Sequence, residues 1–405
     1  MESNLKNRTI LLGVTGSIAA YKAADLASSL TKAGALVDVV LTEAAEKFVS
    51  PMTYSSLTGR SAYTTRDLWE AGEHVLHISL ARRAELLLIA PATANTISAL
   101  ASGRADSLLG MIALAANCPL LVAPAMDAGM YEHPATQANV ETLASRGATM
   151  IGPVEGRMAS GLIGRGRMTE PDEIVGHVRL ALGKDGSLAG QSVLVSAGGT
   201  REPIDPVRAI TNRSSGKQGY AIAQAAIDRG ADVTLITAPT SLKPPVGARV
   251  LQVEQAVDMQ ALVLEETKKT NVLVMAAAVA DYRPHKSSDQ KIKKDGSKLQ
   301  IELEPTDDIL KAVAAQREKT GTPDVVVGFA AESENLVQNA KAKLGEKKLD
   351  LIVANDISRS DAGFAVDTNQ VLLLDSDGVE ELPLQTKAET ASAVMDRVVD
   401  ILHSG

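Results

Sequence analysis

The chain has 405 residues, a length typical of two domains, and its 41 basic against 49 acidic side chains give a formal net charge of −8. Its composition, 45% hydrophobic and 22% charged, excludes wholesale disorder, and the acidic charge with 2% aromatic residues disfavours a dedicated nucleic-acid binder. A single cysteine, Cys118, excludes a disulfide framework and a cysteine-built zinc site; with no export signal and no apolar run of ~20 residues, we expect a cytoplasmic protein without a membrane partner.

Short apolar runs alternate with helical patterns through the first half of the chain. A helix is predicted over Ile18–Lys32, because Ile18, Ala23, Leu26 and Leu30 fall on one apolar stripe and Gly34 follows as a stop signal. Such alternation predicts a parallel sheet covered by helices. Buried strands are expected at Ile10–Val14, Val37–Leu41, Leu86–Ala90 and Leu120–Ala123.

The polar, glycine-rich stretch Gly183–Ser187 interrupts this alternation after a helical pattern at residues 172–182. A new strand pattern begins at Ser192–Ser196, and an amphipathic helix pattern at residues 387–402 closes the chain. We therefore predict an α/β protein with two doubly wound, Rossmann-like domains, at residues 1–185 and 190–405.

Three loops of the first half, at residues 14–18, 91–96 and 124–127, follow strand ends, where open α/β sheets bind ligands, and are expected to face one crevice. The first turn, which contains Gly16 and Ser17, suits a phosphate at a helix N-terminus, although a merely well-capped helix is the alternative. It lacks the GxGxxG spacing of a dinucleotide site. Cys118 precedes a buried strand and is interpreted as a core residue, and from the residues alone either His77 or His74 could be structural.

These segments, VTGSIAAYK, HISLARRAELLLIAPATANT and PAMDAGMY, resemble the flavoprotein family of cysteine decarboxylases. Over about 400 residues the chain resembles bifunctional phosphopantothenoylcysteine decarboxylase/phosphopantothenate–cysteine ligases of coenzyme A synthesis. The resemblance implies that His77, rather than His74, is the active-site histidine. It also implies an FMN site, whose contacts would be Gly16, Ser17, Ile18, Thr42, Thr93, Ala94 and Asn95.

Two positions depart from the pattern of this family. Asp127 stands where the family has an asparagine that holds the substrate carboxylate, so a carboxylate there would oppose the substrate. Ser160 stands where the family's flap carries a cysteine that protonates the enethiol intermediate, and a hydroxyl is a far weaker acid than a thiol. We hypothesise that the domain still decarboxylates, with Asp127 or water supplying the proton.

The second half carries an anion-binding pattern in ITNRSSGKQG (residues 210–219), although the P-loop spacing is absent. The lysines in Lys291–Lys294 suit a triphosphate better than a nucleic acid, because aromatic residues are not interleaved with them; a solvated loop is the alternative.

TREPIDPVRAITNRSSGKQG, AAVADYRP, KIKK and GFAAE are similar to the CTP-dependent ligase half of the same family. The resemblance implies that Asn212 acts on the acyl intermediate, that Lys291 neutralises nucleotide phosphates and that Mg²⁺ accompanies CTP. The CTP contacts it implies are Met275, Ala276, Ala277, Asp281, Thr306, Asp307, Asp308, Ile309, Phe329, Lys343 and Lys347.

The implied substrates are 4′-phosphopantothenate, cysteine and CTP, in a homo-oligomer with a trimeric flavin domain and a dimeric ligase domain. Three alternatives stay open at this point. They are an active ligase fused to a degenerate FMN-binding scaffold, a flavin-binding regulatory protein, and an NAD(P) reductase, which the missing GxGxxG disfavours.

Overall fold

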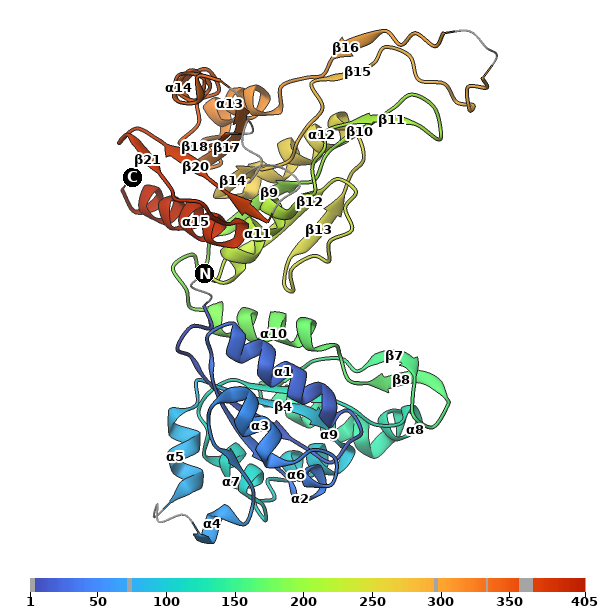
Figure 1. Ribbon diagram of the computed structural model, residues 1–405, viewed down its shortest axis with the longest axis vertical. Coiled ribbons are helices and arrows are strands. Elements are labelled where there is room, and N and C mark those ends of the chain that lie inside the picture. Colours follow the sequence, from blue (N-terminus) through green and yellow to red (C-terminus); the bar gives the residue numbers. More distant parts are fainter. Residues whose placement is uncertain (1–3, 71–74, 295–297, 333, 357–366, 405) are drawn as a thin grey trace. The chain divides into compact units, whose positions relative to one another are not determined.

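The computed structural model describes residues 4–70, 75–294, 298–332, 334–356 and 367–404. The chain divides into two compact units, Glu2–Leu182 and Gly183–Gly405 (Figure 1). Across the described residues, no helix combines the length and apolar character needed to cross a membrane.

The first unit is built on a six-stranded parallel sheet with the strand order β3-β2-β1-β4-β5-β6. The middle strands are buried on both faces, and Leu12 of β1 pairs with Val39 of β2 and Leu88 of β4. The four strands expected from sequence are confirmed. The bounds are β1 (Thr9–Val14), β2 (Leu36–Leu41), β3 (Ala62–Tyr63), β4 (Leu86–Ala92), β5 (Leu120–Pro124) and β6 (Thr149–Met150).

Helices cover both faces of this sheet, as the alternating pattern predicts. One face packs against α1 (Ala20–Lys32), α3 (Pro51–Thr58) and α10 (Pro171–Gly183). The other packs against α5 (Leu76–Arg83), α6 (Ala94–Ser102), α7 (Leu108–Ala115) and α9 (Pro134–Ser145). Shorter elements are α2 (Glu43–Glu46), α4 (Asp67–Glu70), α8 (Ala128–Glu132) and the hairpin of β7 (Val154–Arg157) and β8 (Ile163–Arg167).

Helix α1 begins at Ala20, two residues later than its apolar stripe predicts. Residues 15–19 form a turn in which Ser17 N–H donates to the Thr15 carbonyl at 2.8 Å. Ile18 is therefore outside the helix and 62% exposed, so its predicted place on the buried stripe is wrong. Cys118, interpreted as core, is half-buried against the core of the α5 face, and burial raises the pKa of its thiol.

The second unit has an eight-stranded sheet in the order β13-β12-β9-β14-β17-β18-β20-β21. It is parallel from β13 to β18, and β20 and β21 extend it antiparallel. The order reverses at β9 and β14, which makes this unit doubly wound as well. The bounds are β9 (Ser192–Ala197), β12 (Asp232–Thr237), β13 (Arg249–Gln252), β14 (Val272–Met275), β17 (Val325–Glu332), β18 (Leu351–Asp356), β20 (Val371–Leu374) and β21 (Val379–Glu381).

Helices again flank the sheet. One face packs against α12 (Ala256–Glu266), α13 (Ile309–Thr320) and α14 (Leu336–Glu346), and a 3-10 turn, η1 (Thr267–Lys269), follows α12. Helices α11 (Lys217–Ile227) and α15 (Lys387–Ser404) pack against each other (Figure 1). Three two-stranded pairs lie outside the main sheet: β10 (Arg201–Pro203) with β11 (Ala209–Thr211), β15 (Tyr282–Pro284) with β16 (Leu303–Pro305), and β19 (Thr368–Asn369) with β22 (Gln385–Thr386).

Candidate functional sites

A cavity of about 1130 Å³ lies at the carboxyl ends of β1, β2, β4 and β5 in the first unit. Sequence-predicted residues from five separate segments line it together. They are Gly16, Ser17, Ile18, Thr42, Thr93, Ala94, Asn95, Asp127 and Ser160.

A buried threonine ties the first turn to the loop after β4. Thr15 is 1% exposed, and its Oγ1 donates to the Pro91 carbonyl at 2.7 Å and accepts from Thr93 N–H at 3.1 Å. Gly16 is required next to it, because a Cβ there would lie 2.4 Å from the Ala44 Cβ. Close backbone packing thus leaves the N–H groups that precede α1 at the rim of a cavity, an arrangement suited to a phosphate.

Asp127 and Ser160, the two departures from the family pattern, are hydrogen-bonded to each other. Ser160 Oγ donates to Asp127 Oδ2 at 2.6 Å, and Asp127 Oδ1 accepts from Gly129 N–H at 3.1 Å as the N-cap of α8. Ser160 lies in the turn of the β7–β8 hairpin, whose Met158 Sδ accepts from Ala128 N–H at 3.1 Å. The hairpin therefore closes over the end of β5 and brings both side chains to the same cavity.

Basic side chains that sequence reasoning missed also line this cavity. Lys22 is paired with Glu170 at 2.7 Å, whereas Lys47 and Arg157 have no ion-pair partner among the described residues. They are scattered along the sequence, and although Lys22 ends the segment VTGSIAAYK, only the fold shows that they line one cavity. The full basic set is Lys22, Lys47, Arg104, Arg157 and Arg167.

His77 is not brought into the cavity. It lies half-buried on α5, and none of the described α5 residues lines the cavity. Figure 1 draws α5 and α8 on opposite sides of this unit. His74 lies outside the described residues.

A second cavity, of about 460 Å³, lies at the carboxyl ends of β14, β17 and β18 in the second unit. Twelve sequence-predicted residues meet there. They are Asn212, Met275, Ala276, Ala277, Asp281, Thr306, Asp307, Asp308, Ile309, Phe329, Lys343 and Lys347.

Hydrogen bonds fix the backbone of residues 276–281 along one wall of this cavity. Asn212 Nδ2 donates to the Val279 carbonyl at 3.0 Å, and Thr306 Oγ1 donates to the Ala280 carbonyl at 2.6 Å. Thr200 Oγ1, which is fully buried, accepts from Ala280 N–H at 2.9 Å. Asn212 therefore lies in the cavity with its amide directed at the loop after β14.

The charges of the second cavity are mixed. Lys347 Nζ lies 3.0 Å from an oxygen of Asp308, which also caps α13, and Lys217 pairs with Asp367 at 2.6 Å. Lys387 is 7% exposed, and burial lowers the pKa of its ammonium group, with the nearby Lys217 charge acting in the same direction. Four lysines, Lys217, Lys343, Lys347 and Lys387, thus line this cavity together with Asp281, Asp307 and Asp308.

Sequence reasoning missed a polar chain on the same wall. Asn355 Nδ2 donates to Asn369 Oδ1 at 3.3 Å, and Asn369 Nδ2 donates to Gln218 Oε1 at 3.0 Å. Together with Lys387, these residues come from β18, β19 and the starts of α11 and α15. One sequence signal could have identified Asn355. It lies at the end of a buried apolar strand, which is the position that predicts ligand contacts elsewhere in this sheet.

Lys291 does not line the second cavity. It is exposed on the segment between β15 and β16, which projects from the unit in Figure 1. Within the described parts of the chain, no group of three histidine, cysteine, aspartate or glutamate side chains could hold a metal ion.

Two family models together match nearly the whole chain. The Flavoprotein family matches residues 1–182, and the DNA/pantothenate metabolism flavoprotein C-terminal domain matches residues 188–402. Two solved structures are also similar. The C-terminal domain of a coenzyme A biosynthesis bifunctional protein CoaBC is 40% identical (54% of this chain, 100% of that chain, TM-score 0.46), and a PPC decarboxylase mutant is 38% identical (43% and 98%, TM-score 0.41).

Curated relatives match along the full length. The coenzyme A biosynthesis bifunctional protein CoaBC of Bacillus subtilis is 42% identical over 398 residues, which is 97% of this chain and 97% of the relative. The protein of the same name from Mycobacterium tuberculosis is 44% identical over 409 residues, or 98% and 97%. The chain therefore belongs to the family of coenzyme A biosynthesis bifunctional proteins CoaBC.

Proposed function

We propose that this chain catalyses two consecutive steps of coenzyme A biosynthesis. The ligase, within residues 190–405, joins 4′-phosphopantothenate to cysteine at the expense of CTP. The decarboxylase, within residues 1–185, converts the product, 4′-phosphopantothenoylcysteine, to 4′-phosphopantetheine with FMN. The observation that carries this proposal is that motif residues from separate loops line one cavity in each unit of a chain that matches CoaBC proteins end to end.

The first cavity fits a flavin nucleotide. The turn at Gly16 and Ser17 would hold its phosphate, and Thr93, Ala94 and Asn95 would contact the remainder. Bound flavin would supply the reversible two-electron oxidation of the substrate thiol that gives decarboxylation an electron sink. Lys47 and Arg157 leave positive charge for a second phosphate, that of the substrate.

Asp127 and Ser160 replace the family's amide and thiol with a hydrogen-bonded pair. With Ser160 Oγ 2.6 Å from Asp127 Oδ2, the hydroxyl proton is already directed at a carboxylate. We assign the final protonation of the enethiol to Asp127, which would first take up the proton released when the substrate thiol is oxidised, with Ser160 orienting the carboxyl group.

The ligase reaction begins with attack of the phosphopantothenate carboxylate on the CTP α-phosphate, which releases pyrophosphate; the cysteine amine then displaces CMP. Asn212 lies where it could hold the acyl intermediate, and Lys343 and Lys347 lie where the triphosphate charge would be. Mg²⁺ would enter bound to CTP. The phosphate oxygens would supply most of its ligands, and the aspartates Asp281, Asp307 and Asp308 would supply at most one or two.

We further propose a homo-oligomer that completes both sites, as a trimer through the first unit and a dimer through the second. Exposed apolar side chains at the first cavity support this, with Ile18 and Tyr21 each 62% exposed. The segment that bears Lys291 is flanked by Tyr282 and Leu303, 56% and 45% exposed. Neighbouring copies would supply His77 and Lys291, which do not reach the cavities of their own chain.

One assay tests both activities. Purified protein is incubated with 4′-phosphopantothenate, cysteine, CTP and Mg²⁺, and pyrophosphate and the acyl products are measured by mass spectrometry. Pyrophosphate release over many turnovers that requires both phosphopantothenate and cysteine, followed by 4′-phosphopantetheine formation, is expected; without cysteine, release should stop at about one equivalent per site. Pyrophosphate release in the absence of phosphopantothenate would refute the ligase.

The alternative, a ligase fused to a degenerate flavin scaffold, rests on Asp127 and Ser160. It predicts 4′-phosphopantothenoylcysteine as the end product and restored decarboxylation in the double variant Asp127→Asn, Ser160→Cys. Our assignment instead predicts that the wild type reaches 4′-phosphopantetheine and that Asp127→Asn alone accumulates the enethiol, which is two hydrogens short. A wild type that stops at the enethiol would refute complete decarboxylation.

A further inference from the structure

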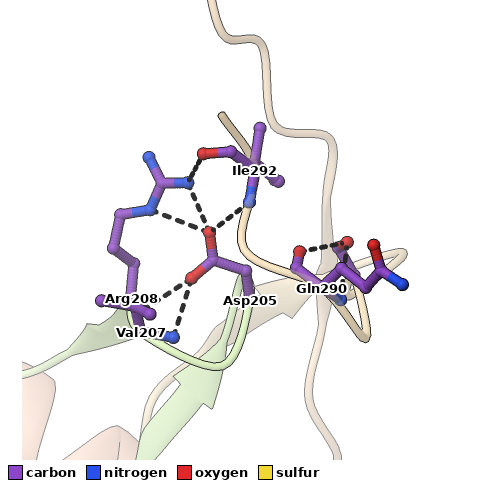
Figure 2. A network of polar contacts seen from close by, with 6 residues as sticks. Asp205, Val207, Arg208, Gln290 and Ile292 are labelled. Atoms are coloured by element: carbon purple, nitrogen blue, oxygen red, sulfur yellow. Dashed lines mark hydrogen bonds and ion pairs between the residues drawn. The ribbon is translucent and has the colours of Figure 1, made fainter. Parts of the chain in front are cut away.

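A buried carboxylate outside both cavities organises the turn between β10 and β11. Asp205 is 3% exposed, and its Oδ1 accepts from the N–H groups of Val207 and Arg208, each at 2.9 Å. Its Oδ2 accepts from Arg208 Nε at 3.0 Å and also from Arg208 Nη2 (Figure 2). The Arg208 guanidinium, together with these backbone donors, holds the pKa of Asp205 well below its usual range.

The same carboxylate reaches a segment more than eighty residues away in sequence. Ile292 N–H donates to Asp205 Oδ2 at 3.2 Å, and the Ile292 carbonyl accepts from Arg208 Nη2 at 3.0 Å. Ser288 N–H donates to the Ile204 carbonyl at 3.0 Å. The turn of residues 204–208 therefore holds both backbone polar groups of Ile292, as Figure 2 shows, although no regular strand includes this residue.

The pairing also determines which charges are left available. Asp205 is neutralised by Arg208, whereas Lys291, Lys293 and Lys294 are exposed and have no ion-pair partner among the described residues. The Asp205–Arg208 pair fixes the backbone at Ile292, between the lysines, without forming an ion pair with any of them. The ammonium groups stay free to meet an anionic ligand.

We propose that Asp205 is a positioning residue of the ligase, which clamps Ile292 and thereby presents Lys291 to the nucleotide triphosphate. This inference rests on the proposed role of Lys291 in CTP binding. Asp205 itself touches no substrate, and it acts through the backbone of the lysine segment. Without the clamp, that segment loses its hydrogen bonds at Ile292 and samples many conformations.

The clamp is tested first without any nucleotide. Limited trypsin digestion of the full chain, read by mass spectrometry, measures cleavage after Lys291, Lys293 and Lys294. Asp205→Ala should raise this cleavage about tenfold, because proteolysis follows the population of the open segment. Asp205→Asn retains the side-chain shape and one hydrogen-bond acceptor, so its cleavage in this segment should be intermediate between that of Asp205→Ala and that of wild type.

Asp375 offers a matched control in the same unit. It is 5% exposed, accepts from the N–H groups of Asp377 and Gly378 in the β20–β21 turn, and pairs with Arg397, but it contacts no lysine segment. Asp375→Ala should lower stability without raising cleavage at Lys291–Lys294. Equal cleavage in both variants, or unchanged cleavage in Asp205→Ala, would overturn the clamp.

Ligase kinetics then test the link to the nucleotide. Asp205→Ala should raise KM for CTP about tenfold and leave KM for cysteine unchanged, since only triphosphate binding uses the lysines. Decarboxylation of supplied 4′-phosphopantothenoylcysteine reports only on the first unit, so calorimetric unfolding of the second unit is the check that the ligase unit of the variant is folded. Equal loss of all ligase parameters would reduce Asp205 to a structural residue. Lys291→Gln with an unchanged KM for CTP would instead refute the proposed role of Lys291 while leaving the cleavage result standing.

Discussion

At the scale of single residues, two helical glycines predict opposite effects of the same substitution. A Cβ on Gly219 of α11 would lie 2.6 Å from the Ala197 Cβ and 2.9 Å from the Ser196 carbonyl oxygen, which are parts of β9 that cannot yield cheaply. Gly219→Ala should therefore destabilise the second unit by about 1–3 kcal/mol and reduce CTP-dependent pyrophosphate release.

The matched substitution is Gly345→Ala in α14, where a new Cβ would have no neighbour within 4 Å. It should stabilise the protein by about 0.5–1 kcal/mol, because alanine loses less backbone entropy in a helix. Calorimetric unfolding of both variants checks the pair. A Gly219→Ala protein as stable as wild type would contradict close packing of α11 on β9.

Sequence reasoning brought separate loops to one crevice because parallel strands end at one edge of a sheet. Gly16, Thr93 and Asp127 were predicted to face one crevice, and the structure confirms that they share a cavity. Lys22 and Asn355 were missed, although Lys22 ends the segment VTGSIAAYK and Asn355 ends a buried apolar strand, because only the fold shows that each side chain reaches a cavity. The positions of His77 and Lys291 could not be derived from motifs, since a motif identifies a residue without saying which surface it reaches.

At the scale of elements, a buried carboxylate ties two segments to β2. Asp38 is 2% exposed, and it accepts two hydrogen bonds from Arg60, at 2.9 and 3.1 Å, and pairs with Arg83 of α5 at 2.9 Å. Asp38→Ala should cost about 3 kcal/mol, because two guanidinium groups lose their partner at once. Urea unfolding followed by the fluorescence of Trp69, the chain's single tryptophan, measures this in the first unit.

An exposed pair provides the comparison for Asp38. Arg66 is 71% exposed and lies 2.7 Å from Glu46, so Arg66→Ala should cost less than about 1 kcal/mol. Equal losses of unfolding free energy in the two variants would contradict a stabilising role specific to the buried carboxylate. The role of Asp38 could not be predicted from the sequence, because Asp38 interrupts an apolar strand pattern and its partners Arg60 and Arg83 lie 22 and 45 residues further along the chain.

Four strands of the first sheet and β9 of the second followed from their apolar runs, whereas the paired segments outside the sheets did not. Strands β7 and β8 contain glycine and arginine with few apolar residues, so period-two alternation is absent. The start of α1 was misplaced because Ile18 continues the apolar stripe across a turn. In both cases a segment that lines the cavity departs from the regular apolar pattern by which helices and strands are predicted.

At the scale of the whole molecule, the two units should respond differently to pH. In the first unit, burial lowers the pKa of His177 on α10, against a smaller opposing effect of Glu173. In the second, burial alone would raise the pKa of Glu266, but hydrogen bonds from Arg249 and Lys269 outweigh it, and the net shift is downward. Both groups thus have folded pKa values below their unfolded ones, of about 6.5 and 4.3 respectively.

A lowered folded pKa contributes stability that is present above the unfolded pKa and is lost as the pH falls through the folded pKa. Between pH 7.5 and 5.5 the first unit should therefore lose about 0.5–1 kcal/mol through His177, while Glu266 stays ionised and leaves the second unit unaffected. Trp69 fluorescence in urea reports the first unit, and calorimetry reports both transitions. In His177→Gln the pH dependence over this interval should flatten. If the variant lost stability as steeply as wild type over this pH interval, the assignment to His177 would be wrong, and another residue would have to cause the pH dependence of the first unit.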